Sequence, residues 1–265
     1  GAPITLSILD ELCYQYKYDY RNRLVEKKLP GKQTEFIVYD KLNRVVATGP
    51  SFSPFTNFVS PNNIGWIITK YDVLDRQILQ AWLQSSTITS ADRKTLQLLY
   101  NNPTLAVSET RSATNVVNGA GSFLTRYTNV AIPSIYATSY HVLSLNYYDD
   151  YNTNIVFTPA ISFTSSVTPQ PVYYNNTIKP KGLLTINWVR VPQTSSLFNA
   201  QRSYALYDNK SRLVREFTNN YLGGYTQIDR QLEVITGRVN YTLKTHKRLS
   251  SSAVITVRDD FTYTN

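Results

Sequence analysis

The chain has 265 residues, and 27 Lys and Arg against 18 Asp and Glu give a formal net charge of +9. Hydrophobic residues make up 42%, enough to bury a core, which excludes a disordered tail. The single cysteine, Cys13, excludes an intrachain disulfide framework, and two histidines leave metal sites short of ligands. No window approaches the roughly 18 consecutive apolar residues of a transmembrane helix. We therefore expect no metal, no cofactor and no transmembrane segment.

The basic residues are scattered along the chain. The densest groups, Lys27-Lys28 and Lys244 to Arg248, are too short to resemble a nucleic-acid-binding arm. A solvated basic face is therefore favoured over a nucleic-acid or lipid contact. The chain begins Gly1-Ala2-Pro3 and contains no methionine, so we expect it to be a processed piece of a longer protein.

The first predicted element is a strand in which Tyr14, Tyr16 and Tyr18 alternate with polar residues, a period of two. It leads into a motif that recurs along the chain: Tyr-Asp, three residues, Arg, then an apolar pair or near-pair. The four copies place these residues at Tyr18, Asp19 and Arg23; Tyr39, Asp40 and Arg44; Tyr71, Asp72 and Arg76; and Tyr207, Asp208 and Arg212. A segment at 50–63, rich in Ser, Pro, Phe and Asn, separates the second and third copies and is predicted to be a loop.

Each copy has the chemistry of a tight turn between two strands. The Asp carboxylate can accept hydrogen bonds from backbone N–H groups shortly after it, which ends the first strand. Asn22, Asn43 and Asp75 are the fourth residues of their turns, counted from the Asp, where a positive φ is easiest for Gly, Asn or Asp. The Arg then begins the return strand, where it can pair with an acid or stack on a ring. Ser211 suits the left-handed place poorly, so we expect the fourth turn to differ in shape.

The middle of the chain departs from this repeat. Thr89 to Asp92 is a possible capping box, and it predicts one helix of about three turns near residues 90–101. Weak alternation over 106–148 indicates further strands, a Thr-, Ser-, Pro- and Asn-rich connection follows, and 183–191 is again a strand.

Degenerate copies are expected at the far end. Gly237-Arg238-Val239 keeps the turn and the Arg, with Val234 where the Asp belongs, and Asp260 to Tyr263 resembles a further entry strand. The prediction is a single all-β segment over 1–265, built of antiparallel hairpins in a curved continuous sheet. Its insertions are expected around 50–63, 86–103 and 152–180.

The candidate chemistry is sparse. The regular recurrence of Asp19, Asp40, Asp72 and Asp208 favours a role in turns over acid–base catalysis, which needs two carboxyls facing one groove. The four arginines are expected to tie neighbouring repeats together. Cys13 is expected to be a buried hydrophobe, and no G-x-S-x-G elbow is present. We therefore predict no catalytic residues and no enzyme.

Aromatic residues leave one alternative open. The chain has 21 Tyr, 10 Phe and 3 Trp, and exposed rings flanked by Asn and Asp suit sugar stacking. Because Tyr recurs at fixed repeat positions, packing is favoured, and a carbohydrate-binding surface module is the alternative function. The candidate stacking residues are Trp66, Trp82, Trp188, Tyr147, Tyr148, Tyr173 and Tyr174.

The four aligned Tyr-Asp-x-x-x-Arg copies resemble the YD-repeat, or Rhs (rearrangement hotspot), family of large bacterial surface and toxin proteins. The segment 23–31 followed by Val38-Tyr39-Asp40, and the segment 219–225, look like the Rhs-like proteins of Gram-negative bacteria. The resemblance covers 14–82 and 204–263. The family's usual Gly before the Arg survives only at Gly237, and the chain has no Asp-Pro dipeptide of the kind found at the family's cleavage motif.

The resemblance implies a particular role. Such proteins build a long β-sheet that forms a hollow shell, which in many members encloses a C-terminal toxin. The chain is accordingly expected to be a shell segment of a secreted or cell-surface protein. Its partners would be the remainder of its own longer chain, with further repeats and an enclosed effector, and possible further partners are glycans or a secretion apparatus.

Overall fold

The computed structural model describes residues 5–60, 63–132, 139–165, 167, 170–175 and 177–264. Strands dominate these residues, and the main sheet has 14 of them, which confirms the all-β fold class. The chain divides into two compact units, Gly1–Leu143 with Pro192–Leu197, and Ser144–Val191 with Phe198–Asn265. The prediction of one segment over 1–265 stays a prediction.

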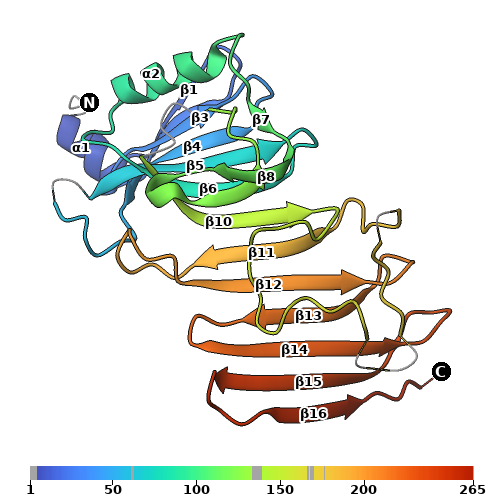
Figure 1. Cartoon of the computed structure of the whole chain (residues 1–265). Helices are drawn as coiled ribbons and strands as arrows, with labels where there is room; N and C mark the ends of the chain where they lie inside the picture. Colours follow the sequence, from blue (N-terminus) through green and yellow to red (C-terminus); the bar gives the residue numbers. More distant parts are fainter. Residues whose placement is uncertain are drawn as a thin grey trace. The chain divides into compact units, whose positions relative to one another are not determined.

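The first unit begins with a helix, continues with hairpins and includes a second helix (Figure 1). Its elements are α1 (Leu6–Leu12), β1 (Gln15–Tyr18), β2 (Leu24–Lys28), β3 (Glu35–Tyr39), β4 (Val45–Phe52), β5 (Ile64–Asp72), β6 (Gln77–Gln84), α2 (Ser90–Asn101), β7 (Ser108–Glu109), β8 (Arg111–Val117), η1 (Ala120–Ser122), β9 (Leu124–Tyr127) and the start of β10 (Tyr140–Tyr148).

Strands β1 to β6 pair antiparallel in chain order, as consecutive hairpins do, and β10 follows β6 in the sheet. Strand β7 pairs parallel with β5, and β8 with β9 forms a separate two-stranded sheet. Alternate residues of β5 are buried, in keeping with a period of two. The core of this unit includes Val38, Val46, Ile68, Ile78 and Trp82.

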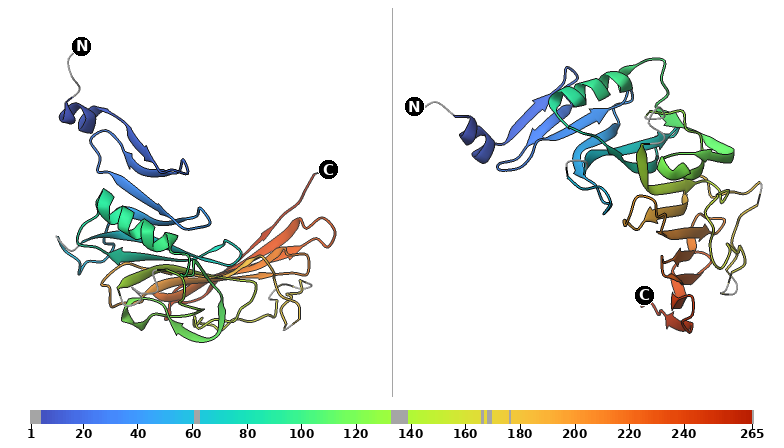
Figure 2. Two further views of the ribbon diagram at one scale, coloured as in Figure 1. Left: turned by 90° about the horizontal axis from the view of Figure 1, so that it is seen from above. Right: turned by 60° about the vertical axis from the view of Figure 1, so that its left-hand side comes forward.

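Helix α2 begins where the capping box was predicted. The Thr89 hydroxyl accepts a hydrogen bond from the Asp92 N–H, and the Asp92 carboxylate accepts one from the Thr89 N–H. The helix packs against β3, where the Gln97 side chain donates to the Tyr39 carbonyl at 2.6 Å and accepts from the Tyr39 N–H at 3.1 Å. Figure 2 shows this helix beside the strands of the first unit.

Three expectations for the first unit need correction. The structure has a second α-helix, α1, with its N-terminus capped by the Thr5 hydroxyl and none of its residues buried. Its leucines Leu6, Leu9 and Leu12 recur at helical spacing, but Leu6 and Leu12 are 81% and 71% exposed. Cys13, which follows α1, is free and half-buried rather than fully buried. Strand β4 also continues through Pro50 to Phe52, so the loop before β5 begins at Ser53.

The second unit consists of antiparallel strands in chain order (Figure 1). Its elements are the remainder of β10, β11 (Leu184–Arg190), β12 (Ala200–Tyr207), β13 (Leu213–Asn219), β14 (Gly223–Leu232), β15 (Val239–Leu249) and β16 (Ile255–Asp260). Tyr204 and Phe217 are cross-strand partners with rings stacked at 4.8 Å. Strand β16 ends at Asp260, so the predicted entry strand from Asp260 to Tyr263 is not formed.

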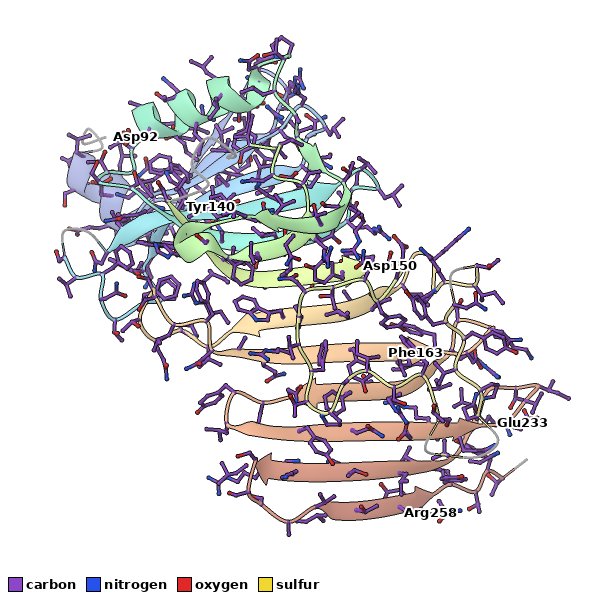
Figure 3. All side chains as sticks on the ribbon, in the orientation of Figure 1. Asp92, Tyr140, Asp150, Phe163, Glu233 and Arg258 are labelled. Carbon is purple, nitrogen blue, oxygen red and sulfur yellow. The ribbon has the colours of Figure 1, made fainter. Side chains whose placement is uncertain are left out.

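The long connection between β10 and β11 crosses one face of the sheet in this unit, and Figure 3 labels Phe163 on it. Asn219 of β13 donates to the Thr158 carbonyl at 2.6 Å and accepts from the Thr158 N–H at 3.0 Å. Arg215 donates to the Ser162 carbonyl at 3.0 Å. These bonds attach an otherwise irregular segment to the strands and bury aromatic side chains beneath it, among them Phe157.

Candidate functional site

The four Tyr-Asp-x-x-x-Arg copies fold into one turn with one hydrogen-bond pattern. In the second copy, Asp40 Oδ1 accepts from the N–H groups of Leu42 and Arg44, at 2.9 and 3.0 Å. The other oxygen, Oδ2, accepts from the Arg44 Nε and lies 2.7 Å from its Nη2. The same bonds recur at Asp19, Asp72 and Asp208. Each carboxylate therefore ends one strand and holds the Arg that begins the next.

The fourth residue of each turn, counted from the Asp, has a left-handed backbone conformation. Asn22, Asn43 and Asp75 have φ values of 57°, 62° and 62°, and Ser211 has a φ of 61°. The expectation that the Ser211 turn differs in shape is therefore wrong. The hydrogen bonds around Asp208 match those of the other three copies. They hold the Ser211 backbone in the left-handed conformation, although serine has no special preference for it.

Arg23, Arg44 and Arg212 also reach the turn of the next hairpin. The Arg44 Nη1 donates to the Asp72 carbonyl at 3.4 Å and lies 2.6 Å from the Asp75 carboxylate. Its guanidinium lies 4.6 Å from the centroid of the Tyr71 ring, and the Tyr71 hydroxyl donates to the Val45 carbonyl at 2.8 Å. One arginine thus joins two hairpins by charge, hydrogen bonds and ring contact.

The preceding copy repeats these contacts. Arg23 donates to Asn43 Oδ1 at 3.0 Å, lies 4.6 Å from the Tyr39 ring centroid, and approaches the Asp40 carbonyl. Tyr39 donates to the Leu24 carbonyl at 2.9 Å. In the second unit, Arg212 donates to the carbonyls of the following turn. We call this set of Asp, Arg and Tyr contacts between successive hairpins the turn ladder.

The Asp19 carboxylate is held in its charged form by its partners. Burial alone would raise the pKa of Asp19, but hydrogen bonds from the Arg23 side chain and from backbone N–H groups outweigh it and lower that pKa. Asp40 is fully buried and its Arg44 partner is nearly so. Such pairs are costly to break because removal of one member leaves an unpaired buried charge.

Two further turns are of the same kind: one was not predicted, and the other was expected as a degenerate copy but with Val234 at the Asp place. Asn220 replaces the Asp between β13 and β14, where its Oδ1 accepts from the N–H groups of Leu222 and Gly224. Between β14 and β15, Glu233 rather than Val234 stands at the Asp place, and its carboxylate accepts from Ile235 and Thr236 in a turn one residue longer. An Asx residue followed by Gly was the available signal for the first of these turns.

The predicted sugar-stacking residues are mostly inside the protein. Trp66, Trp82, Trp188 and Tyr147 are at most 4% exposed, so almost none of their ring surface is open for a sugar to stack on, although Trp66 is among the residues that line a pocket. Tyr148 is half-buried, as are Tyr173 and Tyr174. Tyr174 stacks on Phe163 and meets Tyr151 edge-on, so its ring is used in packing.

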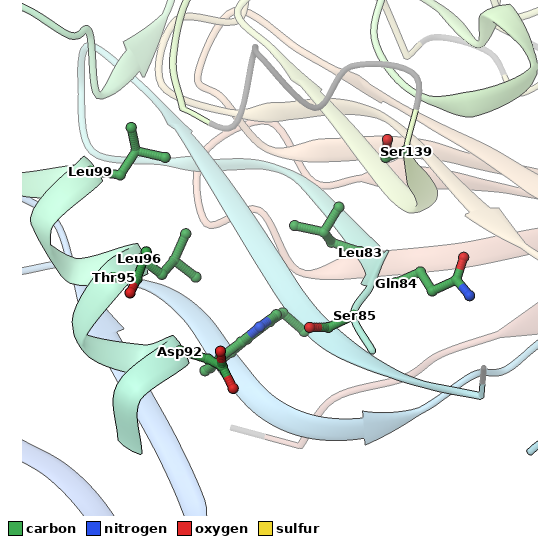
Figure 4. Close-up of a pocket in the computed structure, with 9 residues that line it drawn as sticks. Leu83, Gln84, Ser85, Asp92, Thr95, Leu96, Leu99 and Ser139 are labelled. Carbon is green, nitrogen blue, oxygen red and sulfur yellow. The ribbon is translucent and has the colours of Figure 1, made fainter. Parts of the chain in front are cut away.

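A pocket of about 660 Å³ lies between α2 and the ends of β5 and β6 (Figure 4). Its apolar lining includes Trp66, Leu83, Leu96 and Leu99, and its polar lining includes Gln84, Ser85, Asp92, Thr95 and Ser139. The Asp92 carboxylate is already engaged in the α2 capping box. Within the described ranges, no group of three or more His, Cys, Asp or Glu side chains is arranged to hold a metal, and no helix is long and apolar enough to cross a membrane.

One buried polar group was not anticipated. Lys70, Glu109 and Asn129 meet in the first unit although they are far apart in the chain. The sequence contains one signal for a buried amine: Lys70 lies at an inward position of β5, in phase with Trp66 and Ile68. Nothing in the sequence indicates which residues would meet its amine.

The fold and the turn ladder define the class as an all-β repeat protein whose hairpins are joined by arginine–aspartate contacts. Comparison with protein-family models found no match, and comparison with curated proteins found no matching relative.

Proposed function

We propose that the chain is a structural segment of the β-sheet shell of an Rhs-like secreted or cell-surface toxin protein. In this role it encloses or presents an effector that lies outside this chain. The observation that carries the proposal is the turn ladder, in which each Arg binds its own Asp, and Arg23, Arg44 and Arg212 also bind the turn of the next hairpin. The four motif copies on which the Rhs resemblance depends are the residues that form it.

The turn ladder is better suited to a structural role in a shell than to a catalytic site. Its carboxylates are saturated by backbone N–H groups and guanidinium groups, so none is available for proton transfer to a substrate. A sheet built of such hairpins extends by adding another copy, because each turn offers carbonyl oxygens to the preceding Arg. Strength along the sheet is the property that a protective shell requires.

The last strand of the sheet supports the same role. All six residues of β16 are exposed, and among the described residues its outer edge has no partner strand. Ile255 and Val257 are 60% and 46% exposed. An open edge with apolar side chains pairs readily with another strand, as expected where further repeats of a longer chain would continue.

The carbohydrate-binding alternative has less support, because four of its candidate rings are buried. Its remaining test residue is Tyr148, and titration with oligosaccharides would examine it. Sub-millimolar binding that is lost in Tyr148→Ala and retained in a matched exposed variant, Tyr221→Ala, would favour the alternative over the shell segment.

Light scattering coupled to size exclusion tests the shell segment. We expect concentration-dependent association of the 30.2 kDa chain, and a decrease in association in the double variant Ile255→Lys and Val257→Lys. Val234→Lys, at an exposed turn position, is the matched control and should associate as the unmodified chain does. A monomer at every concentration would contradict the proposal.

A further inference from the structure

A buried amine, a carboxylate and a carboxamide meet in the first unit. The Lys70 Nζ lies 2.8 Å from Glu109 Oε1 and 2.7 Å from Asn129 Oδ1. Lys70 and Glu109 are 2% and 0% exposed, and Asn129 is half-buried. The Lys70 Nζ also lies 5.4 Å from the ring centroid of Tyr140, a fully buried residue that Figure 3 labels.

The backbone around the cluster holds the carboxylate and the amide in place. Glu109 Oε1 accepts from the Ala131 N–H, and Oε2 accepts from the Val130 N–H and the Thr128 hydroxyl. The Asn129 Nδ2 donates to the Val117 carbonyl at 3.1 Å. Both acid and amide are therefore oriented by partners other than the amine.

An ion pair alone is a poor explanation for this arrangement. The desolvation of two buried charges offsets most of their attraction, and burial lowers the pKa of Lys70 despite the nearby carboxylate. A lysine with a lowered pKa more readily provides the neutral amine, which is the nucleophilic form. The amide carbonyl in contact with that amine is an electrophile.

We propose that Lys70 and Asn129 form an intramolecular isopeptide bond, with Glu109 as the proton carrier. The bond joins the Lys70 Nζ to the Asn129 Cγ, and the bond from Cγ to Nδ2 breaks. The proposal rests on these three side chains and does not depend on the shell function.

The reaction needs no external reagent. Glu109 first takes a proton from the Lys70 ammonium, and the resulting neutral amine attacks Cγ. Glu109 then delivers its proton to Nδ2 and accepts one from the attacking nitrogen. Ammonia leaves, and it takes the remaining proton from Glu109 to become ammonium. The net change converts a lysine ammonium and an asparagine amide into a secondary amide and ammonium, with the Glu109 carboxylate restored.

The geometry is close to that of attack. A carbonyl bond of about 1.23 Å places Cγ roughly 3–4 Å from an amine that is hydrogen-bonded to Oδ1, and reacting atoms in near-attack arrangements are about 3–3.5 Å apart. The Tyr140 hydroxyl lies 3.3 Å from Asn129 Oδ1, where a donor stabilises the oxygen as it gains negative charge. It lies equally far from Asn118 Oδ1, so its single proton has two possible acceptors.

The bond would cross-link two segments that are distant in the chain. Lys70 belongs to β5, and Asn129 follows β9, so the closed loop contains α2 and the small β8–β9 sheet. Such a link constrains the unfolded chain as a disulfide does. It would supply covalent strength to a unit whose one cysteine cannot form an intrachain disulfide.

Intact mass spectrometry of the purified, denatured chain tests the proposal. We expect the mass to be lower than the sequence mass by one ammonia, and trypsin to leave Lys70 uncleaved in a peptide joined to the one that contains Asn129. Glu109→Gln and Lys70→Arg should restore the full mass. Asn129→Asp should lose one water in place of ammonia, a result that a merely structural role does not produce.

Lys17→Arg is the matched control, because the Lys17 amine also contacts a carboxylate, that of Glu26, at 2.7 Å. This variant should keep the loss of one ammonia. A full sequence mass for the unmodified chain, with cleavage after Lys70, would overturn the proposal. So would a mass loss that maps to a succinimide at Asn118-Gly119 instead of a cross-linked peptide.

Discussion

The Arg44 guanidinium lies 4.6 Å from the ring centroid of Tyr71, and the Tyr71 hydroxyl donates back to the carbonyl of Val45, the residue beside Arg44. The two side chains belong to successive hairpins and each binds the other's strand. Arg23 and Tyr39 repeat this exchange one hairpin earlier. Reciprocal contact of this kind fixes the spacing between hairpins as well as the shape of each turn.

Loss of a ladder carboxylate should destabilise the first unit strongly. In Asp40→Ala the nearly buried Arg44 loses one of its two carboxylate partners, and two backbone N–H groups lose their acceptor. We expect the free energy of unfolding to fall by about 3–5 kcal/mol, measured by urea denaturation. Asp259→Ala, on the exposed strand β16, is the control and should leave stability unchanged. An equal effect of the two substitutions would contradict the role of the ladder.

The left-handed residue of the fourth turn should tolerate glycine and reject a β-branched side chain. Ser211 has a φ of 61°, a conformation that costs most L-residues about 1–2 kcal/mol. Serine already carries this cost, so Ser211→Gly should not destabilise the chain, whereas Ser211→Val should lower the unfolding free energy because a β-branched side chain is disfavoured further at positive φ. Thermal or urea unfolding of the two variants decides between them. Similar stability of the two would mean that this turn is not left-handed in solution.

Stability should depend on pH through Glu233, which Figure 3 labels at the β14–β15 turn. Hydrogen bonds from the Thr236 hydroxyl and from the backbone of Ile235 and Thr236 lower the pKa of Glu233 to about 2, from a usual value of 4.5. A depressed folded-state pKa contributes stability above the unfolded-state value, and this contribution is lost as the pH falls from 4.5 to about 2.

The variant Glu233→Gln removes that titration. Urea midpoints measured across this pH range should therefore change less in Glu233→Gln than in the unmodified chain. Glu11→Gln, in the exposed helix α1, serves as the control and should keep the original pH dependence. If Glu233→Gln also keeps the pH dependence of the urea midpoint, the Glu233 carboxylate is not held by the hydrogen bonds from Ile235 and Thr236 in solution.

Attachment of α2 to the sheet should depend on one amide. Gln97 pairs with both backbone groups of Tyr39, at 2.6 and 3.1 Å, and Gln97→Ala leaves these groups without that partner. Because an unsatisfied buried polar group costs about 1–3 kcal/mol, we expect a loss of that size in urea unfolding. Leu98→Ala, at a position that is 72% exposed on the same helix, should have little effect. A comparable loss in Leu98→Ala would show that the loss in Gln97→Ala does not come from the contact with Tyr39.

Hydrogen bonds between residues close together in the chain could be predicted from the sequence. The Asp carboxylates close their turns on N–H groups two and four residues away, and the capping box of α2 closes within three residues. The positive φ values at Asn22, Asn43 and Asp75 follow from the same short range. Helix α1 has only seven residues, too few for the spacing of Leu6, Leu9 and Leu12 to distinguish a helix from a strand.

The rest depended on contacts between distant residues. Aromatic content suggested exposed ring faces, but the sheet buries Trp82 and Trp188, because rings of this size contribute most when they are removed from water. Strand alternation, the turns and the capped helix follow from short-range patterns, since each depends on residues close together in the chain. The contacts of Arg44 and the meeting of Lys70 with Glu109 and Asn129 depend instead on the folded arrangement of the strands and connections. These partners lie 28 to 63 residues away, and only strand pairing and folding of the connections bring them within hydrogen-bond distance.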